Sequence, residues 1–470
     1  MNISGITTPS LCDLVYRYPI FNISFPEPAF LPSFSFAYRG ANISYFPSSS
    51  SVFCMFLILV FLPLVVVLTR FTMADSFADR VLSALGFSKN HTSTNMDIPH
   101  YLPNRQFHVA PSEHFIHSVH GTYPRLCRLP DGSLLAGYTT FSTLATDDTN
   151  HTVNEHILTI ARSTDNGHSF SPWGEVARSA GDLDNLFLLP LPNSETVLAA
   201  FRNHDLSPED GKMHTFFRIT VCESTDAGQT WHFLSQAAEK EAPFGFWEPF
   251  LRLGSEPGEI QLYFSQEFAP DDQNTMLTRS FDGGRTWSTP VIVTGEGERL
   301  RDGMVGLAKT WDCFYIGNGE EEGEEGEKTR REALALVMET TRHGPFSIEA
   351  VLSYDGGHTF GHRQVVYEPR HGKHAGAPQI ASFVDGSVAV VFMTDEDGDG
   401  RSHWPHGAQI KVVFSGPPIN GRFHWTSPMV VGDSPSFWPG IMRVGDHEVL
   451  AVYELSSSIR GKILSVTSWM

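Results

Sequence analysis

The chain has 470 residues and a formal net charge of −20, with 41% hydrophobic and 12% aromatic residues. A chain of this length and apolar content can bury one large core or the cores of two ordinary domains. The acidic balance argues against nucleic acid or an anionic membrane surface as the partner, because both favour clustered Lys and Arg.

The first hundred residues are predicted to lie outside the main folded domain. Residues 1–51 are interpreted as a disordered extension, residues 52–71 as a signal segment and residues 72–104 as a linker. The apolar run VFCMFLILVFLPLVVVLT at 52–69 carries no charge and is about as long as a membrane span. It is either an uncleaved signal anchor or a signal peptide whose true start is Met55.

Both interpretations direct the rest of the chain into the secretory pathway, either secreted or anchored with its folded part outside the cytoplasm. Asn90-His-Thr and Asn150-His-Thr would then be glycan acceptors. The five cysteines give no disulfide framework, and Cys127, Cys222 and Cys313 are predicted to be buried free thiols. The scattered histidines predict no metal site, and no cofactor is expected.

From about residue 100 the sequence consists of short β-type runs broken by Gly, Pro, Asn and Asp, which predicts an all-β domain over residues 105–470. Four segments share the pattern Ser-x-Asp-x-Gly-x-Thr/Ser-Trp/Phe, with aspartates at 165, 226, 282 and 355. The Asp carboxylate can accept backbone N–H bonds, Gly takes a positive φ, and the aromatic ring is buried beneath the turn. We predict that these turns stabilise the fold and carry no chemistry.

Six segments share a second pattern of a small or Pro residue, an apolar run, a polar turn and another apolar run. Each supplies the first two strands of a four-stranded unit, so the six units predict a six-bladed β-propeller. The last unit ends in KILSVTSW, and its fourth strand is predicted at FHVAP (107–111), which would close the ring by pairing the two ends of the domain. The acidic stretch EEEGEEGEK at 320–328 is predicted to be a solvated loop between the first two strands of the fourth unit.

Equivalent positions in superposable blades lie at the same level around the central axis, so the position of a residue within its repeat predicts its level in the ring. We call the end of the ring where the first strands begin the mouth. The residues predicted at the start of these strands are Tyr123, Asp184, Glu248, Asp302, Ala377 and Pro439. The second strands return to the mouth and finish at Thr139, Arg202, Ser265, Glu339, Thr394 and Glu454. The four repeated turns fall at the opposite end.

Carboxylates and aromatic rings therefore meet at the mouth. Alone, each carboxylate could be a solvated rim residue or the partner of an arginine. Sugar hydrolysis requires such a combination, because one carboxylic acid protonates the departing glycosidic oxygen while a second carboxylate attacks or guides water at the anomeric carbon. The residues in question are Asp184, Glu248, Asp302 and Glu339, interleaved with Tyr123, Trp247, Trp438 and Arg202.

The same segments resemble the sialidase-superfamily propellers that carry Asp-box repeats, and in particular the fungal exo-1,5-α-L-arabinanases of glycoside hydrolase family 93. The resemblance covers about residues 105–470 and rests on GTYPRLCRLPDGSLLAGYT, GDLDNLFLLPLP with AFRNH, WEPFLR with YFSQEFAPDDQN, RDGMVG, AGAPQI with FMTDED, and FWPGI. It implies a retaining, exo-acting hydrolase that releases arabinobiose from linear α-1,5-arabinan. The apolar run, the N-terminal extension and the acidic insertion depart from the family's pattern.

The resemblance also implies roles for the mouth residues. The family's two catalytic glutamates correspond by motif to Glu248 in WEPF and Glu339 in LVMET, assigned as general acid/base and nucleophile respectively. A retaining mechanism predicts that their carboxyl groups lie about 5–5.5 Å apart. Arg125 would orient a carboxylate or a sugar oxygen. Substrate hydroxyls and ring faces would be held by Tyr123, Asp184, Arg202, Trp247, Asp302 and Trp438.

Two alternatives stay open. An exo-sialidase of the same architecture would use Arg125, Arg202 and Arg301 to grip a substrate carboxylate, although the acidic mouth would repel an anionic sugar. A non-catalytic glycan-binding propeller at the cell surface is the other. The stretch DEDGDG at 395–400 resembles half of a calcium loop but is interpreted as a polar loop at the mouth. The expected partner is an oligosaccharide or polysaccharide, and the expected state is a monomer.

Overall fold

The computed structural model describes residues 105–468, apart from 118–119, 146–151, 210, 317–326, 371 and 399–402. The predicted extension, apolar run and linker, together with both predicted glycan acceptors, lie outside the described residues. Within the described part of the chain, no helix has the length and apolar character needed to cross a membrane.

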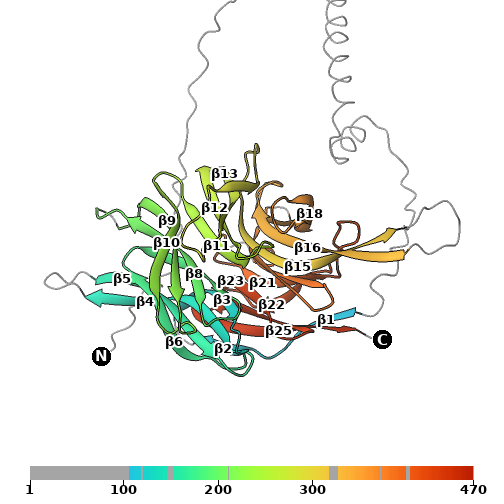
Figure 1. The fold of residues 1–470 in the computed structure, drawn as a ribbon, viewed down its shortest axis with the longest axis horizontal. Coiled ribbons are helices and arrows are strands. Elements are labelled where there is room, and N and C mark those ends of the chain that lie inside the picture. The colour runs from blue at the N-terminus through green and yellow to red at the C-terminus, as the bar shows by residue number, and fades with distance from the viewer. Residues whose placement is uncertain are drawn as a thin grey trace, which may run out of the picture. The chain divides into compact units, whose positions relative to one another are not determined.

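The described residues form six antiparallel sheets of four main strands each, which confirms the predicted six-bladed β-propeller (Figure 1). Blade 1 contains β3 (Gly121–Arg128), β4 (Leu134–Ala145), β5 (Thr152–Ser163) and β6 (Ser171–Ser179); blade 2 contains β7 (Asp182–Pro190), β8 (Val197–Leu206), β9 (His214–Ser224) and β10 (His232–Glu241). Blade 3 contains β11 (Phe246–Leu253), β12 (Ile260–Ala269), β13 (Asp272–Ser280) and β14 (Val291–Thr294); blade 4 contains β15 (Asp302–Ile316), β16 (Glu327–Thr340), β17 (Ser347–Ser353) and β18 (Gly361–Tyr367). Blade 5 contains β19 (Ala375–Ser382), β20 (Val388–Thr394), β21 (Gln409–Ser415) and β22 (Met429–Gly432); blade 6 contains β23 (Ser436–Arg443), β24 (Glu448–Leu455), β25 (Ser458–Ser468) and β1 (Arg105–Val109).

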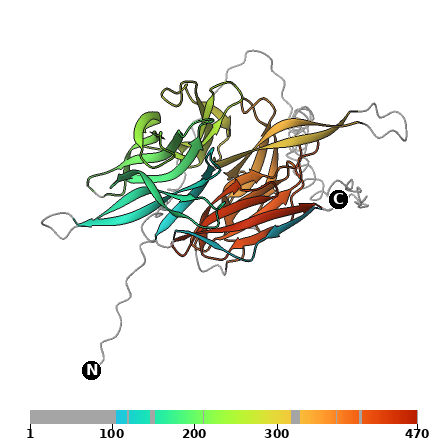
Figure 2. The same ribbon diagram turned by 60° about the horizontal axis from the view of Figure 1, so that its bottom comes forward.

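The first strand of each blade lies innermost, and these six strands contact one another in a closed circle in which β23 returns to β3. Figure 2 shows the colours succeeding one another around this circle. A separate cluster of buried apolar side chains lies between each pair of successive blades. The core is thus divided among six interfaces between sheets, which bury apolar surface on both faces of every blade.

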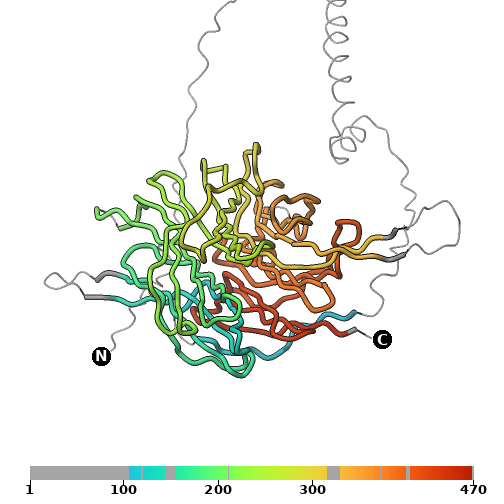
Figure 3. Tube along the Cα trace, viewed as in Figure 1, coloured from blue at the N-terminus to red at the C-terminus, as the bar shows by residue number. Residues whose placement is uncertain are grey.

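The ring closes through its two ends, as the sequence predicts. β1 pairs antiparallel with β25, with Phe107 opposite Val466, and the short strand β2 (His114–His117) also pairs with β25. Figure 3 shows the blue trace of β1 beside the red trace of β25. The acidic insertion falls between β15 and β16, whose long hairpin extends beyond the other strands of its blade (Figure 2). Most of the insertion lies outside the described residues.

The cysteines of the propeller are free. Cys127 and Cys222 are buried, as predicted, whereas Cys313 is only half-buried because it lies on the outer part of the long β15–β16 hairpin.

The repeated turns have one hydrogen-bond pattern, seen for example around Asp282 between β13 and β14. Its carboxylate accepts the Ser280 hydroxyl at 2.8 Å, the Thr286 amide at 2.9 Å and the Thr286 hydroxyl at 2.6 Å. The Gly284 amide donates to the Ser280 hydroxyl oxygen at 2.9 Å. These bonds, led by the one from the Thr286 side chain, lower the pKa of Asp282 to about 2. The turn is therefore closed by its own side chains.

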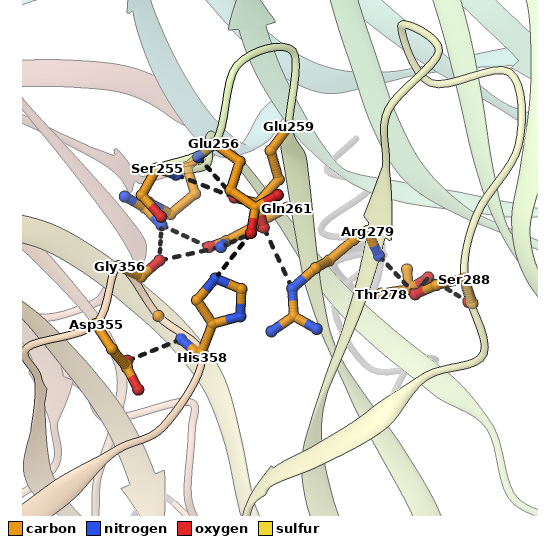
Figure 4. A network of polar contacts seen from close by, with 12 residues as sticks. Ser255, Glu256, Glu259, Gln261, Thr278, Arg279, Ser288, Asp355, Gly356 and His358 are labelled. Atoms are coloured by element: carbon orange, nitrogen blue, oxygen red, sulfur yellow. Dashed lines mark hydrogen bonds and ion pairs between the residues drawn. The ribbon is translucent and has the colours of Figure 1, made fainter.

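The same turns also dock onto the preceding blade. The Ser235 hydroxyl of blade 2 donates to the Gly284 carbonyl of blade 3 at 2.6 Å. In blade 3, Arg252 and Gln261 both donate to the Gly356 carbonyl of blade 4 at 3.0 Å, and Figure 4 shows the Gln261 contact. Repetition of the turn thus repeats a contact between blades, at the end of the ring opposite the mouth.

Beside Gln261, a buried carboxylate organises the receiving side of that contact (Figure 4). Glu259 is 1% exposed and accepts the Ser255 amide at 3.0 Å and the Gln261 side-chain amide at 2.8 Å. Arg279 lies 3.2 Å from the same carboxylate. Because the groups that hydrogen-bond or pair with Glu259 belong to blade 3, blade 3 presents a preformed polar surface to the turn of blade 4, whose His358 also lies near this carboxylate.

A shared bulge near the start of each inner strand positions the mouth. In all six, two residues interrupt the ladder to the second strand. The first of each pair has a positive φ between 45° and 56°. These six residues are Tyr123, Asn185, Glu248, Met304, Ala377 and Trp438.

This register corrects the sequence alignment of the mouth. Glu248 is itself the bulge residue of its strand. In their own strands, Asp184 lies one position before the bulge residue, Asp302 lies two positions before it, and Pro439 lies one position after it. The alignment was anchored on small residues and prolines, whereas the backbone repeats the left-handed position whatever residue occupies it. The carboxylates predicted to be equivalent are therefore not at one level.

We predict that Asp282→Ala destabilises the propeller by about 1 kcal/mol, because it removes several hydrogen bonds at an exposed turn. The lowered pKa of Asp282 means that its contribution is present above the unfolded pKa of about 4 and is lost as pH falls through about 2. Urea unfolding of wild type and variant should therefore differ at pH 7 and converge near pH 2. Asp446→Ala, in the exposed turn between β23 and β24, is the control, and an equal loss there would contradict the prediction.

Candidate active site

Glu248 and Glu339 come from neighbouring blades and meet at the mouth. Glu248 occupies the bulge of β11, and Glu339 lies next to the end of β16 opposite Gly303. The Met304 amide of blade 4 donates to the Ser265 hydroxyl of blade 3 at 3.1 Å, and this hydrogen bond joins the two blades that carry the glutamates. The negative charge of Glu339 is close enough to raise the pKa of Glu248. The predicted pair is thus brought together.

Glu248 has the environment of a carboxylic acid that stays protonated. Burial, followed by the charge of Glu339, raises its pKa to about 8 against the opposing effects of Arg202, a Ser265 hydrogen bond and Arg301. Its Oε2 atom is buried and has no hydrogen-bond partner among the described residues. A carboxyl group with so little compensation for burial retains its proton at neutral pH.

Glu339 is better able to carry a negative charge. Burial raises its pKa, but the Ala377 amide and the Arg301 charge act in the opposite direction. The Ala377 N–H donates to Glu339 Oε2 at 2.8 Å. Gly376 permits this approach, because a Cβ atom there would lie 2.6 Å from the same oxygen. When the pair holds one proton, it therefore resides on Glu248 and the charge on Glu339.

Arg202 lies beside the pair in a buried network of blade 2. It is 5% exposed, its Nη2 atom is 3.0 Å from Asp182 and 3.4 Å from Asp184, and its guanidinium lies 5.4 Å from the Trp247 ring centroid. Asp184 is 4% exposed and also accepts the Thr139 hydroxyl at 2.5 Å. Arg202 and Asp184, which are predicted to contact substrate, are therefore also held by contacts within the protein, and Arg202 lies beside Trp247 and acts to lower the pKa of Glu248.

Asp302 is not placed as the sequence suggested. Its side chain is fully buried, and its two oxygens accept Arg363 Nη1 at 2.6 Å and Nη2 at 2.9 Å. Arg363 also donates to the buried Glu349. This bidentate pair joins the inner strand of blade 4 to its outer strand. The placement does not support the predicted contact between Asp302 and substrate, because Asp302 lies two residues before the bulge.

Aromatic rings stand on several sides of the mouth. Tyr123 and Trp438 stack with ring centroids 4.5 Å apart and an interplanar angle of 20°. Trp247 adjoins Glu248, and its Nε1 atom is buried without a hydrogen-bond partner among the described residues. The predicted aromatic residues thus line the mouth or its wall, where rings can pack against sugar faces.

Sequence analysis missed Trp404. A Cβ atom on Gly376 would lie 3.1 Å from Trp404 Cζ2 and 2.6 Å from Glu339 Oε2. The indole and the carboxylate therefore both lie against Gly376. Trp404 also stacks on His374 with centroids 5.3 Å apart. The available signal was its place just after DEDGDG, the stretch interpreted as a polar loop at the mouth.

Arg125 lies within the ring, below the mouth. Its Nη1 atom donates to the carbonyls of Pro124 at 2.8 Å and Pro439 at 2.9 Å, and burial lowers its pKa to about 10. It lines a small pocket together with Asn185 and Glu248. Asn185 was also missed from the sequence, because the alignment treated it as a small residue rather than as the equivalent of Glu248.

In the described part of the chain, no group of three or more His, Cys, Asp or Glu residues is arranged to hold a metal ion. The two carboxyl groups of the mouth can perform proton transfer and nucleophilic attack, because burial holds Glu248 protonated and Glu339 accepts an amide hydrogen bond.

No protein-family model matches the chain, and no curated protein matches it. Solved structures share its fold. A mutant α-L-arabinofuranosidase from Fusarium graminearum, in complex with an iminosugar inhibitor, is 16% identical, with 76% of this chain and 98% of that chain covered and a TM-score of 0.54. The family 93 α-L-arabinofuranosidase of the same fungus with arabinobiose has a TM-score of 0.53 at 16% identity over 76% of this chain and 98% of that chain. A protein of unknown function from Dyadobacter fermentans is 16% identical, with coverages of 78% and 100% and a TM-score of 0.53. These similarities show that the chain shares the propeller fold of these proteins.

We predict that Glu248 is protonated at pH 7 and titrates near pH 8, and that Glu339→Gln lowers its pKa by removing a nearby negative charge. Carbon-13 NMR of the glutamate carboxyl groups measures both effects. Glu454, whose pKa burial raises to about 7, also titrates in this range, so Glu248→Gln and Glu454→Gln identify the two signals. A Glu248 signal that titrates near its ordinary pKa, or does not move in Glu339→Gln, would contradict the prediction.

Proposed function

We propose that the chain is a retaining, exo-acting glycoside hydrolase that cleaves α-1,5-linked L-arabinan and releases arabinobiose. The observation that carries the proposal is the pair of unlike carboxyl groups at the mouth. Glu248 is held in its protonated form, while Glu339 accepts an amide hydrogen bond and carries the charge. Environments that separate the protonation states of two neighbouring carboxyl groups are what a glycosidase requires.

In the first step, Glu248 donates its proton to the departing glycosidic oxygen, and the Glu339 carboxylate forms a bond to the anomeric carbon as the C–O bond breaks. Glu248 is then ionised. In the second step it removes a proton from water, whose oxygen attacks the anomeric carbon and displaces Glu339. The free sugar is released with retained configuration, and both side chains return to their starting states.

The charges at the mouth support a neutral sugar rather than a sialic acid. Arg202 is held by Asp182 and Asp184, and Arg301 lies 2.8 Å from Glu267 and also contacts Gln273. Two of the three arginines that a sialidase would need are thus neutralised within the protein. A substrate carboxylate would also be repelled by the charge of Glu339, which disfavours an anionic sugar.

Three aromatic positions support a pyranose- or furanose-binding cleft around the carboxyl pair. Trp247 adjoins Glu248, Trp404 adjoins Glu339, and the Tyr123–Trp438 stack stands on the far side of the ring from them. The family 93 enzyme of Fusarium graminearum, which shares the fold, was solved with arabinobiose. We include in the proposal that the propeller acts outside the cytoplasm, as the apolar run at 52–69 predicts.

The full-length protein is expected to release arabinobiose from linear arabinan and no sialic acid from a sialyl substrate. Glu248→Gln and Glu339→Gln should each reduce the rate by at least about 10²–10⁴-fold with little change in Tm. Glu195→Gln, an exposed glutamate at the opposite end of blade 2, should retain activity. Chromatography of the products measures all of these. Release of sialic acid instead would establish the sialidase, and glycan binding with no turnover would establish a non-catalytic propeller.

The assignment of roles is tested with azide and 4-nitrophenyl α-L-arabinobioside. In Glu339→Ala, azide replaces the missing nucleophile and should give a glycosyl azide of inverted configuration. In Glu248→Ala, the activated substrate still forms the covalent intermediate, so azide should intercept it and give a product of retained configuration. NMR of the two products determines their anomeric configuration. Opposite configurations would exchange the roles of Glu248 and Glu339.

A further inference from the structure

The inner strands present two successive layers of side chains to the axis, and a small pocket lies between them. The upper layer contains the bulge residues, including Asn185 and Glu248, and the lower layer contains residues two positions further along each strand. Phe187 and Phe250 in the lower layer pack with ring centroids 4.3 Å apart. The residues that line the pocket include Arg125, Asn185, Phe187, Glu248, Phe250 and Gln379.

Polar atoms in this pocket are buried and have no partner in the described part of the chain. Asn185 is 6% exposed, and neither its Oδ1 atom nor Glu248 Oε2 has a hydrogen-bond partner there. Arg125 donates from Nη1 to two backbone carbonyls, and the charges of Asp184 and Glu248 favour its cationic form. Since nearly all buried polar groups in folded proteins are hydrogen-bonded, such a concentration at one place indicates that a ligand satisfies them.

The chemistry of these atoms identifies the class of ligand. The guanidinium supplies donors, and Asn185 Oδ1 supplies an acceptor, so the ligand group must both accept and donate hydrogen bonds. A hydroxyl group does both. A carboxylate or phosphate would leave Asn185 Oδ1 without a donor and would lie against Glu248. The paired rings of Phe187 and Phe250 leave room for one small group rather than for a whole sugar ring.

We propose that this pocket binds one hydroxyl group of the sugar whose bond is cleaved, with Asn185 as the residue that recognises it. The inference rests on the proposed function, because the sugar is identified through that activity. In the free protein the same donors and acceptors would bind a single water, which the hydroxyl displaces. Because the pocket adjoins Glu248, a sugar held there is fixed relative to the acid, and a sugar without that hydroxyl leaves Asn185 Oδ1 and Glu248 Oε2 unpaired.

The first test uses crystals of the sugar-free, full-length protein. A water within hydrogen-bond distance of Asn185 Oδ1 and Arg125 is expected in wild type and should be absent or displaced in Asn185→Gly. This substitution removes the carboxamide while tolerating the φ of 56° at this position. Asn166→Gly is the matched control, since Asn166 has a φ of 59° in a turn at the opposite end of the ring. A wild-type pocket that contains no ordered group, or an anion instead, would overturn the proposal whatever the substrate is.

The second test is calorimetric titration with arabinobiose and its monodeoxy analogues. One analogue should bind wild type about 10- to 100-fold more weakly than arabinobiose, the usual cost of leaving buried polar groups unpaired. Asn185→Gly should weaken arabinobiose binding by a similar factor but should not weaken that analogue further, whereas Asn166→Gly should match wild type. Losses that multiply for every analogue would overturn the role of Asn185. If arabinobiose does not bind wild type, the arabinan proposal fails, while the crystallographic test still decides the pocket.

Discussion

A left-handed residue near the start of every inner strand is the constraint on which the mouth depends. Five of these six positions are occupied by residues other than Asn, for which a positive φ costs about 1–2 kcal/mol. Regular pairing with the second strand resumes on both sides of the bulge, and this ladder holds the strained backbone in place. Glu248 therefore owes its position to the blade, with the strain offset by the strands around it.

The two ends of the ring have different roles, because one joins the blades and the other carries the candidate active site. At one end, turns closed by their own Asp and Ser side chains join each of several blades to the blade before it. At the other end, polar groups such as Asn185 Oδ1 and Glu248 Oε2 are buried and find no hydrogen-bond partner within the ranges that the structure describes. A fold can tolerate unpaired groups at the mouth because its contacts between blades are made elsewhere, which is the usual relation between a binding site and the scaffold that carries it.

The sequence predicted the architecture well, because its periodic signals are properties of every blade. Six repeated strand pairs, the turn pattern and the strand at 107–111 were sufficient to predict the propeller and its closure, and the pairing of Glu248 with Glu339 followed. Individual mouth residues were harder. Asp302 was displaced by a bulge that has no sequence signature, since residues as different as Met304 and Trp438 occupy it. Asn185 escaped notice because the same bulge shifted the alignment by one residue, and Trp404 because its place beside Glu339 arises from a contact with another blade.

The unlike environments of the two glutamates are themselves products of the closed ring. Glu339 of blade 4 is stabilised as an anion by the Ala377 amide of blade 5, and the pKa of Glu248 in blade 3 responds to Arg202 of blade 2. Four successive blades thus decide where one proton resides. Neither glutamate has these neighbours within its own sheet, so an isolated blade could not hold one carboxyl group protonated and the other charged. The β1–β25 pairing that completes the sixth blade therefore supports the chemistry as well as the fold, although it lies in a different blade from both glutamates.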